Sequence, residues 1–160
     1  MAGDPEEFER AKTEAEPLFC QALDSYNPDF PYRVIWREQT NGAFDKQGHT
    51  DVECDVMCPD GFIERAIFDI KDVKRKNFGT GNYTLKQDCV EYFKKYRGLS
   101  FFAFRLNDGK EKRLDSFVVV PTKDVVSNFP LKQMDNGEYL CSLAEIKEKC
   151  PIWWTMEKDF

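Results

Sequence analysis

Two neighbouring stretches in the middle of the chain alternate apolar and polar side chains with a period of two. The first, residues 51–58, places valines and cysteines on one face and mostly acidic side chains on the other. The second, residues 62–71, follows the turn signal Pro59-Asp60-Gly61. A period of two is typical of a β-strand, and a tight turn between two such stretches predicts an antiparallel hairpin.

Patterns elsewhere predict helices and further strands around this hairpin. Apolar residues recur at helical spacing from about residue 5 to 22, with Pro17 expected to kink or divide that helix. The remaining expected elements are a strand at 33–38, a helix at 84–97, strands at 99–106 and 116–121, and a short helix at 142–149. This order predicts an α/β sandwich, in which helices flank a mixed central sheet of four or five strands.

The length of the chain fits one domain. We expect residues 1–160 to form it, with a core at about 5–121 and a C-terminal extension at 122–160. No apolar run approaches the roughly 18 residues needed to span a bilayer. The start, MAGDPEEFER, has no apolar segment typical of a signal peptide. We therefore expect an intracellular protein, cytoplasmic or nuclear, with no membrane partner.

Charge is distributed unevenly along the chain. The net charge is −6, yet residues 71–113 contain 12 basic and 5 acidic residues. A basic middle beside an acidic cluster would suit a metal site that handles phosphate. The alternative is a set of solvated helix faces, and the charge pattern by itself leaves both interpretations open.

Candidate chemistry lies on the acidic face of the hairpin. Asp55 lies on the first strand and Asp69 on the second, and we expect the hairpin to bring both carboxylates to one end of the sheet. Such a site would suit Mg²⁺ or Mn²⁺, with the carbonyl of Ile70 as a further ligand. Lys71 shares the face of Asp69, so its ammonium can hold an attacking water or stabilise charge on a phosphate.

These residues resemble the PD-(D/E)XK nuclease superfamily over about residues 49–97. Asp69-Ile70-Lys71 matches the (D/E)XK signature, and Asp55 matches the upstream aspartate. Asp60 also follows a proline, but it is expected at the tip of the hairpin, so Asp55 is favoured. The resemblance implies a restriction-endonuclease-like fold and a Mg²⁺- or Mn²⁺-dependent nuclease that hydrolyses phosphodiester bonds.

The helix after the signature adds two candidates. RecB-type branches of this superfamily carry a Gln and a Tyr there, and Gln87 and Tyr92 are the matching residues, although their spacing is five rather than four. The resemblance also implies an acidic residue on the first helix. Glu9, Glu14 and Glu16 are available, and the sequence does not choose among them.

Other residues near the signature have accessory or binding roles in this interpretation. His49 resembles the histidine ligand of cap-snatching endonucleases, or it is an ordinary loop residue. Asp51 and Glu53 share the face of Asp55 and either support the metal or are solvated. The residues expected to contact the nucleic-acid backbone are Lys74, Arg75, Lys76 and Lys86.

Two classes of function remain open at this point. The first is an active nuclease whose partner is DNA or RNA, acting as an endonuclease or an exonuclease. The second is an inactive module that keeps the fold and binds nucleic acid or a protein. The intact Asp–Asp–Lys trio favours the first. A homodimer is also considered, because many nucleases of this type dimerise, but no dimer face stands out in the sequence.

Overall fold

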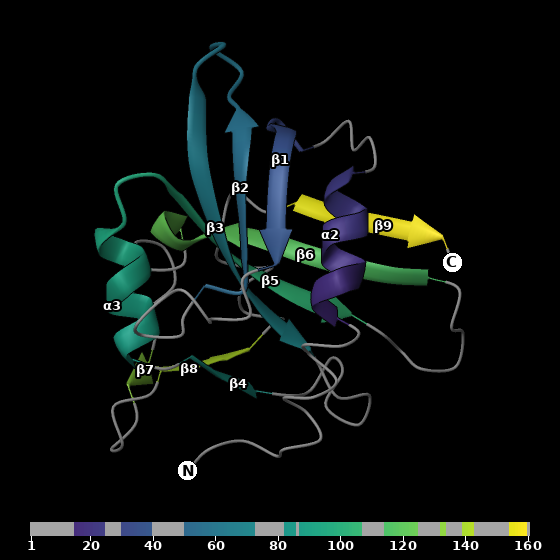
Figure 1. Ribbon diagram of the computed structural model, residues 1–160. Coiled ribbons are helices and arrows are strands. Elements are labelled where there is room, and N and C mark those ends of the chain that lie inside the picture. The colour runs from purple at the N-terminus through teal and green to yellow at the C-terminus, as the bar shows by residue number, and fades with distance from the viewer. Residues whose placement is uncertain are drawn as a thin grey trace.

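The computed structural model describes residues 15–24, 30–39, 50–72, 82–85, 87–106, 114–124, 132–133, 139–142 and 154–159. Its main elements are two helices and nine strands within those residues (Figure 1). In chain order they are α2 (Glu16–Asp24), β1 (Arg33–Gln39), β2 (Val52–Met57), β3 (Ile63–Asp72), β4 (Asn82–Leu85), α3 (Gln87–Lys95), β5 (Leu99–Leu106), β6 (Leu114–Pro121), β7 (Lys132–Gln133), β8 (Tyr139–Ser142) and β9 (Trp154–Asp159). None of the helices in this part of the chain is long and apolar enough to cross a membrane.

The strands form a large mixed sheet and a small one. The large sheet has the order β1-β2-β3-β5-β6-β9, and the small sheet has the order β4-β8-β7. Within the large sheet β3 and β5 are parallel, and every other neighbouring pair is antiparallel. The parallel step requires a crossover between β3 and β5, and α3 lies in that connection. The mixed sheet flanked by helices is therefore confirmed, with six strands instead of four or five.

Strands β2 and β3 form the predicted hairpin, whose tip extends beyond the neighbouring strands (Figure 1). At the tip, the N–H of Cys58 donates to the Phe62 carbonyl at 2.8 Å, and the N–H of Gly61 donates to the Cys58 carbonyl at 2.9 Å. Gly61 has φ of 91°, a conformation that a residue without Cβ adopts readily. The turn is centred on Asp60, so residues equally far from Asp60 face each other across the hairpin.

Aromatic side chains build the core on both faces of the large sheet. On one face, the ring of Phe19 from α2 lies 5.0 Å from Phe68 and 5.1 Å from Phe117. On the other, Phe93 of α3 stacks on Phe102 of β5 with centroids 5.3 Å apart. Because side chains alternate along a strand, Phe102 lies opposite the residues of β5 that join the α2 core.

Helix α2 follows from its apolar spacing. Phe19, Ala22 and Leu23 are buried at the i, i+3 and i+4 positions that share one helix face. Pro17 lies in the first turn, where its missing N–H has no partner to lose. The part of the predicted helix before Ala15 lies outside the described residues.

Most predicted strands are confirmed, and one helix boundary is wrong. The strands expected at 33–38, 99–106 and 116–121 are β1, β5 and β6. The helix expected at 84–97 starts only at residue 87, because residues 82–85 form β4 and pair with β8. Ser142 ends β8, and the rest of the short helix predicted there falls outside the described residues.

The C-terminal part of the chain contributes to both sheets. β9 forms the outer edge of the large sheet by pairing with β6. β8 joins β4 to β7 in the small sheet. Residues after 121 thus extend the same sheet that holds the hairpin.

Candidate functional site

The register of the hairpin places Asp51 level with Asp69. Val52 pairs with Phe68, and the N–H of Asp51 donates to the Phe68 carbonyl at 3.0 Å. The Asp51 carboxylate then accepts a hydrogen bond from the N–H of Ile70 at 2.8 Å, through Oδ2. This bond ties the start of β2 to the strand that carries the D-x-K triplet.

Asp69 is a buried carboxylate with two donors on one oxygen. Its side chain is 8% exposed, and the Lys71 ammonium lies 3.2 Å from Oδ2. The thiol of Cys89, from the first half of α3, lies 3.6 Å from the same oxygen. A strand and the crossover helix therefore both hold the Asp69 side chain in place.

Glu16 brings a third carboxylate from α2. It is buried, with 2% of its surface exposed, and its Oε1 accepts a hydrogen bond from the Gln39 side chain at 3.2 Å. Its negative charge contributes to raising the pKa of Asp51, which places it within electrostatic range of the pair. Among Glu9, Glu14 and Glu16, only Glu16 lies in the described part of the chain.

Burial and charge crowding perturb the acid groups of this cluster. Burial raises the pKa of the Asp51 carboxyl well above its ordinary value, and the charge of Asp69 and a hydrogen bond with it raise it further. Burial also raises the pKa of the Cys89 thiol, with Asp69 adding to the effect. Burial is thus the main cause of both pKa shifts, and the negative charge of Asp69 adds to it.

The same negative charges favour the charged form of Lys71. Burial disfavours its charged form, but the negative charges around it, Asp69 foremost, outweigh burial and raise the pKa of Lys71 above its ordinary value. Its ammonium therefore stays charged at neutral pH. A fixed cation beside buried carboxylates is the electrostatic arrangement that phosphate chemistry uses.

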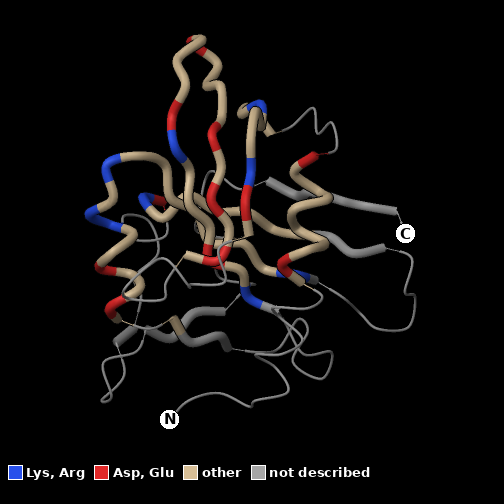
Figure 2. The backbone as a smooth tube through the Cα atoms, viewed as in Figure 1, with Lys and Arg blue, Asp and Glu red and all other residues tan. Residues whose placement is uncertain are grey.

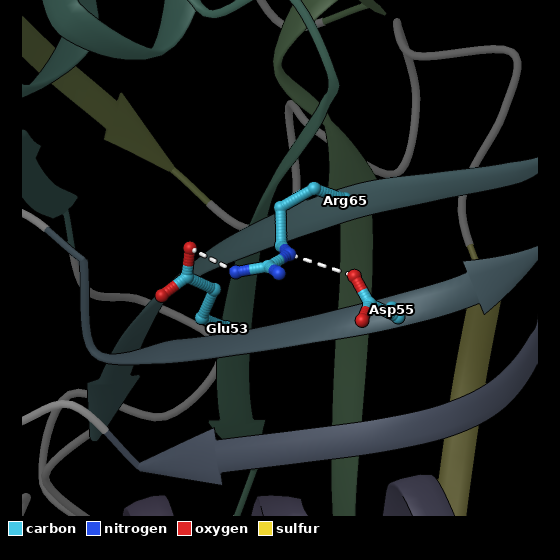
Figure 3. A network of polar contacts seen from close by, with 3 residues as sticks. All are labelled: Glu53, Asp55 and Arg65. Carbon is cyan, nitrogen blue, oxygen red and sulfur yellow. Dashed lines mark hydrogen bonds and ion pairs between the residues drawn. The ribbon is translucent and has the colours of Figure 1, made fainter.

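The structure corrects the assignment of Asp55. Asp55 pairs with Arg65 across the hairpin and binds it, with Arg65 Nε 2.7 Å from Asp55 Oδ1 (Figure 3). It lies four residues along β2 from Asp51, roughly 13 Å at about 3.3 Å per residue. Asp55 and Asp69 therefore do not converge on one ion. The expectation that Asp55 meets Asp69 fails because the facing residues of β2 and β3 lie equally far from Asp60. Asp69 therefore faces Asp51.

Glu53 belongs with Asp55 and not with the buried site. Its Oε1 accepts a hydrogen bond from Arg65 Nη1 at 2.9 Å, so Arg65 bridges both carboxylates (Figure 3). The Arg65 guanidinium also lies over the ring of Trp36, 5.3 Å from its centre. Glu53 and Asp55 therefore share one cation in an exposed network on the hairpin, and the ion-pair partner of Glu53 is Arg65.

The residues expected on the following helix lie at its surface. Gln87 is exposed at the first position of α3. Tyr92 is half-buried and stacks on Tyr96, with ring centroids 6.4 Å apart. The helix residue that contacts Asp69 is Cys89 instead. Cys89 is buried on this helix, and only the packing of α3 on the sheet identifies its carboxylate partner.

Several predicted site residues fall outside the described ranges. They are His49, Lys74, Arg75, Lys76 and Lys86, together with Glu9 and Glu14. Ile70 is described, and its N–H binds Asp51 between the two signature residues.

The donor set partly fits a divalent cation. Among the residues that the structure describes, no group of three or more His, Cys, Asp or Glu side chains is arranged to hold a metal ion. Asp51 and Asp69 still form a pair of adjacent carboxylates, and Mg²⁺ is commonly held by one or two carboxylates with water completing the shell. The chemistry of the pair therefore suits Mg²⁺ or Mn²⁺ with solvent ligands.

Comparison with known proteins adds nothing to this picture. No family model, no curated protein and no solved structure matches the chain. The candidate site is therefore defined by its own residues. We call Asp51, Asp69, Lys71, Glu16 and Cys89 the buried cluster.

Proposed function

We propose that the protein is a metal-dependent nuclease whose site is the buried cluster. The single observation that carries the proposal is the convergence of Asp51, Asp69 and Lys71. Two carboxylates and a lysine meet across the hairpin, with Lys71 3.2 Å from Asp69 and Asp51 bound to the intervening Ile70. Burying such charges is costly, so their retention favours a catalytic role.

The topology supports the finer proposal of a restriction-endonuclease-like fold. Helix α2 is followed by the antiparallel strands β1, β2 and β3, then by α3 and the parallel strand β5. The D-x-K triplet lies on β3, beside the parallel neighbour β5. This is the element order that the resemblance to PD-(D/E)XK nucleases implies.

The proposed reaction adds water across one P–O bond of nucleic acid. The water oxygen bonds to phosphorus, the bond to the leaving oxygen breaks, and that oxygen takes up a proton. A bound Mg²⁺ or Mn²⁺ ion would supply Lewis-acid stabilisation of the phosphate charge. Asp51 and Asp69 would hold the ion. The charged Lys71 side chain would orient the water or stabilise negative charge on the phosphate oxygens.

One observation favours a second candidate, a binding module without catalysis. Lys71 contacts Asp69 directly, and the described residues contain no ready-made group of three metal ligands. A domain that kept the fold and bound nucleic acid or a protein would need no such group.

A cleavage assay separates the two candidates. The native protein and Asp69→Asn should be incubated with Mn²⁺ or Mg²⁺ and labelled single- and double-stranded DNA and RNA. We expect the native protein to cut at least one substrate, and Asp69→Asn, which keeps the side-chain shape, to cut none. Binding without cleavage by the native protein would replace the nuclease proposal with the binding module.

A further inference from the structure

The outer surface of α3 contains a hollow that the buried cluster does not use. Its volume is about 580 Å³. The residues that line it are Asp88, Glu91, Tyr92, Lys95, Tyr96 and Arg97. They come from the helix and from the two residues that follow it, where the chain turns into β5. The buried side of the same helix carries Cys89, which contacts Asp69.

Two stacked tyrosines line this hollow. The rings of Tyr92 and Tyr96, four residues apart, lie 6.4 Å from each other with an angle of 29° between their planes. Both side chains remain half-buried, so part of each ring faces solvent. Gly98 lies behind Tyr96, since a Cβ at Gly98 would approach Tyr96 Cε1 to 2.8 Å. The absence of a side chain at Gly98 therefore leaves room for the Tyr96 ring.

The charges of the hollow separate along the helix. Lys95 and Arg97 are exposed beside Tyr96 at its C-terminal end, while Asp88 lies in the first turn, where the helix dipole favours an acid (Figure 2). Glu91 is partly neutralised by an ion pair with Lys94 at 3.7 Å. The lining contains two acidic and two basic residues, and the two exposed cations, Lys95 and Arg97, lie next to Tyr96 at the C-terminal end of the hollow.

Stacked aromatic rings beside cations match the chemistry of unpaired nucleotides. An exposed base can stack on a tyrosine face while lysine and arginine contact the adjoining phosphates. Bases inside a duplex are already covered by their neighbours, so they cannot use such a surface. We propose that the hollow on α3 binds single-stranded nucleic acid, with a base on Tyr96 and Tyr92 and phosphates at Lys95 and Arg97.

This inference rests on the proposed function, because it names single-stranded nucleic acid as the substrate of the nuclease. Binding to the hollow can nevertheless be measured without cleavage. The assay is fluorescence anisotropy in EDTA with labelled oligothymidylate, oligouridylate and a mixed-sequence duplex. We expect both single strands to bind more tightly than the duplex. The two homopolymers show whether the hollow favours DNA or RNA.

Variants test the two parts of the hollow separately. Tyr96→Leu keeps an apolar side chain but removes the aromatic face, and it should weaken single-strand binding roughly 5- to 150-fold, the usual range for one stacked base. Lys95→Ala and Arg97→Ala should each lower the slope of log affinity against log salt concentration by about one, the amount expected for one lost phosphate contact. Lys123→Ala removes an exposed lysine outside the hollow and serves as the matched control, with unchanged affinity.

Three outcomes would overturn the inference. They are equal binding of duplex and single strand, single-strand affinity that is unchanged in Tyr96→Leu and in both charge variants, or no binding of any nucleic acid. In the last case the hollow would be a site for a protein. If the native protein binds single strands through the hollow yet cuts nothing, only the nuclease proposal fails. If it cuts while Tyr96→Leu binds normally, only the hollow fails.

Discussion

The hairpin carries two charged clusters of similar composition in different surroundings. The buried cluster joins Asp51 and Asp69 to Lys71, whereas an exposed cluster joins Glu53 and Asp55 to Arg65. The Asp69 side chain is 8% exposed, and the Asp55 side chain is 35% exposed. In the exposed cluster one guanidinium binds both carboxylates at 2.7 and 2.9 Å.

The difference teaches that environment separates chemistry from ordinary surface charge. Exposed ion pairs contribute little to stability because water screens them, so the Arg65 network needs no functional explanation. The buried cluster has excess negative charge, and burial raises the pKa of Asp51. Perturbed pKa values of this kind are common at functional sites, which makes the buried cluster the candidate site.

The largest expected difference between the clusters is in cleavage. Lys71→Ala should reduce the rate by about 10²–10³, the usual effect of removing one positioned electrostatic group. Arg65→Ala is the matched control, since it removes a cation of the same hairpin that does not contact Asp69, and its rate should equal that of the native protein. Single-turnover rates in Mn²⁺ measure both. If Arg65→Ala lost as much rate as Lys71→Ala, the buried cluster could not be distinguished from the exposed cluster by its role in cleavage.

The second expected difference is in stability. Lys71→Ala leaves a buried carboxylate without its cation and should lower the free energy of unfolding by about 1–3 kcal/mol. Arg65→Ala breaks exposed pairs and should cost no more than about 1 kcal/mol. Urea unfolding at neutral pH, followed by circular dichroism, gives both values. Equal costs would show that the clusters are equally solvated.

A smaller effect should appear in the pH dependence of stability. Because folding raises the pKa of Asp51, the native state holds its proton where the unfolded state has lost it. The native protein should therefore lose stability as pH rises above about 4, the ordinary value for aspartate. Asp51→Asn removes this loss, so it should be more stable than the native protein at pH 7 in metal-free buffer. Urea unfolding at about pH 4 and at pH 7 measures the effect. Asp55→Asn should show no such gain in stability.

The sequence predicted the hairpin well but not which residue of its first strand faces Asp69. Alternation identified both strands and the shared face of Asp69 and Lys71, because side-chain direction follows a period of two. It did not identify which residue faces Asp69, since that depends on the centre of the turn. Counting equal steps from Asp60 leads to Asp51, not Asp55. The signal was present in the sequence, but the turn geometry was needed to use it.

Other features depend on packing between distant segments. The place of Glu16 within electrostatic range of Asp51 requires knowing how α2 lies against the start of β2. The contact of Cys89 with Asp69 requires α3 to pack on the sheet. Strand β4 was missed because its partner β8 lies more than fifty residues later, and no local pattern reveals such a pairing. Long-range contacts decide all three.

The central claim is that Asp51, and not Asp55, completes the site of Asp69 and Lys71. Calorimetric titration with Mn²⁺ of the native protein, Asp51→Asn and Asp55→Asn tests it most directly, since the two variants make the same chemical change four residues apart on one hairpin. We predict that the native protein and Asp55→Asn bind the ion alike, and that Asp51→Asn loses binding. Loss of binding in Asp55→Asn with retention in Asp51→Asn, or no binding by the native protein, would contradict the account.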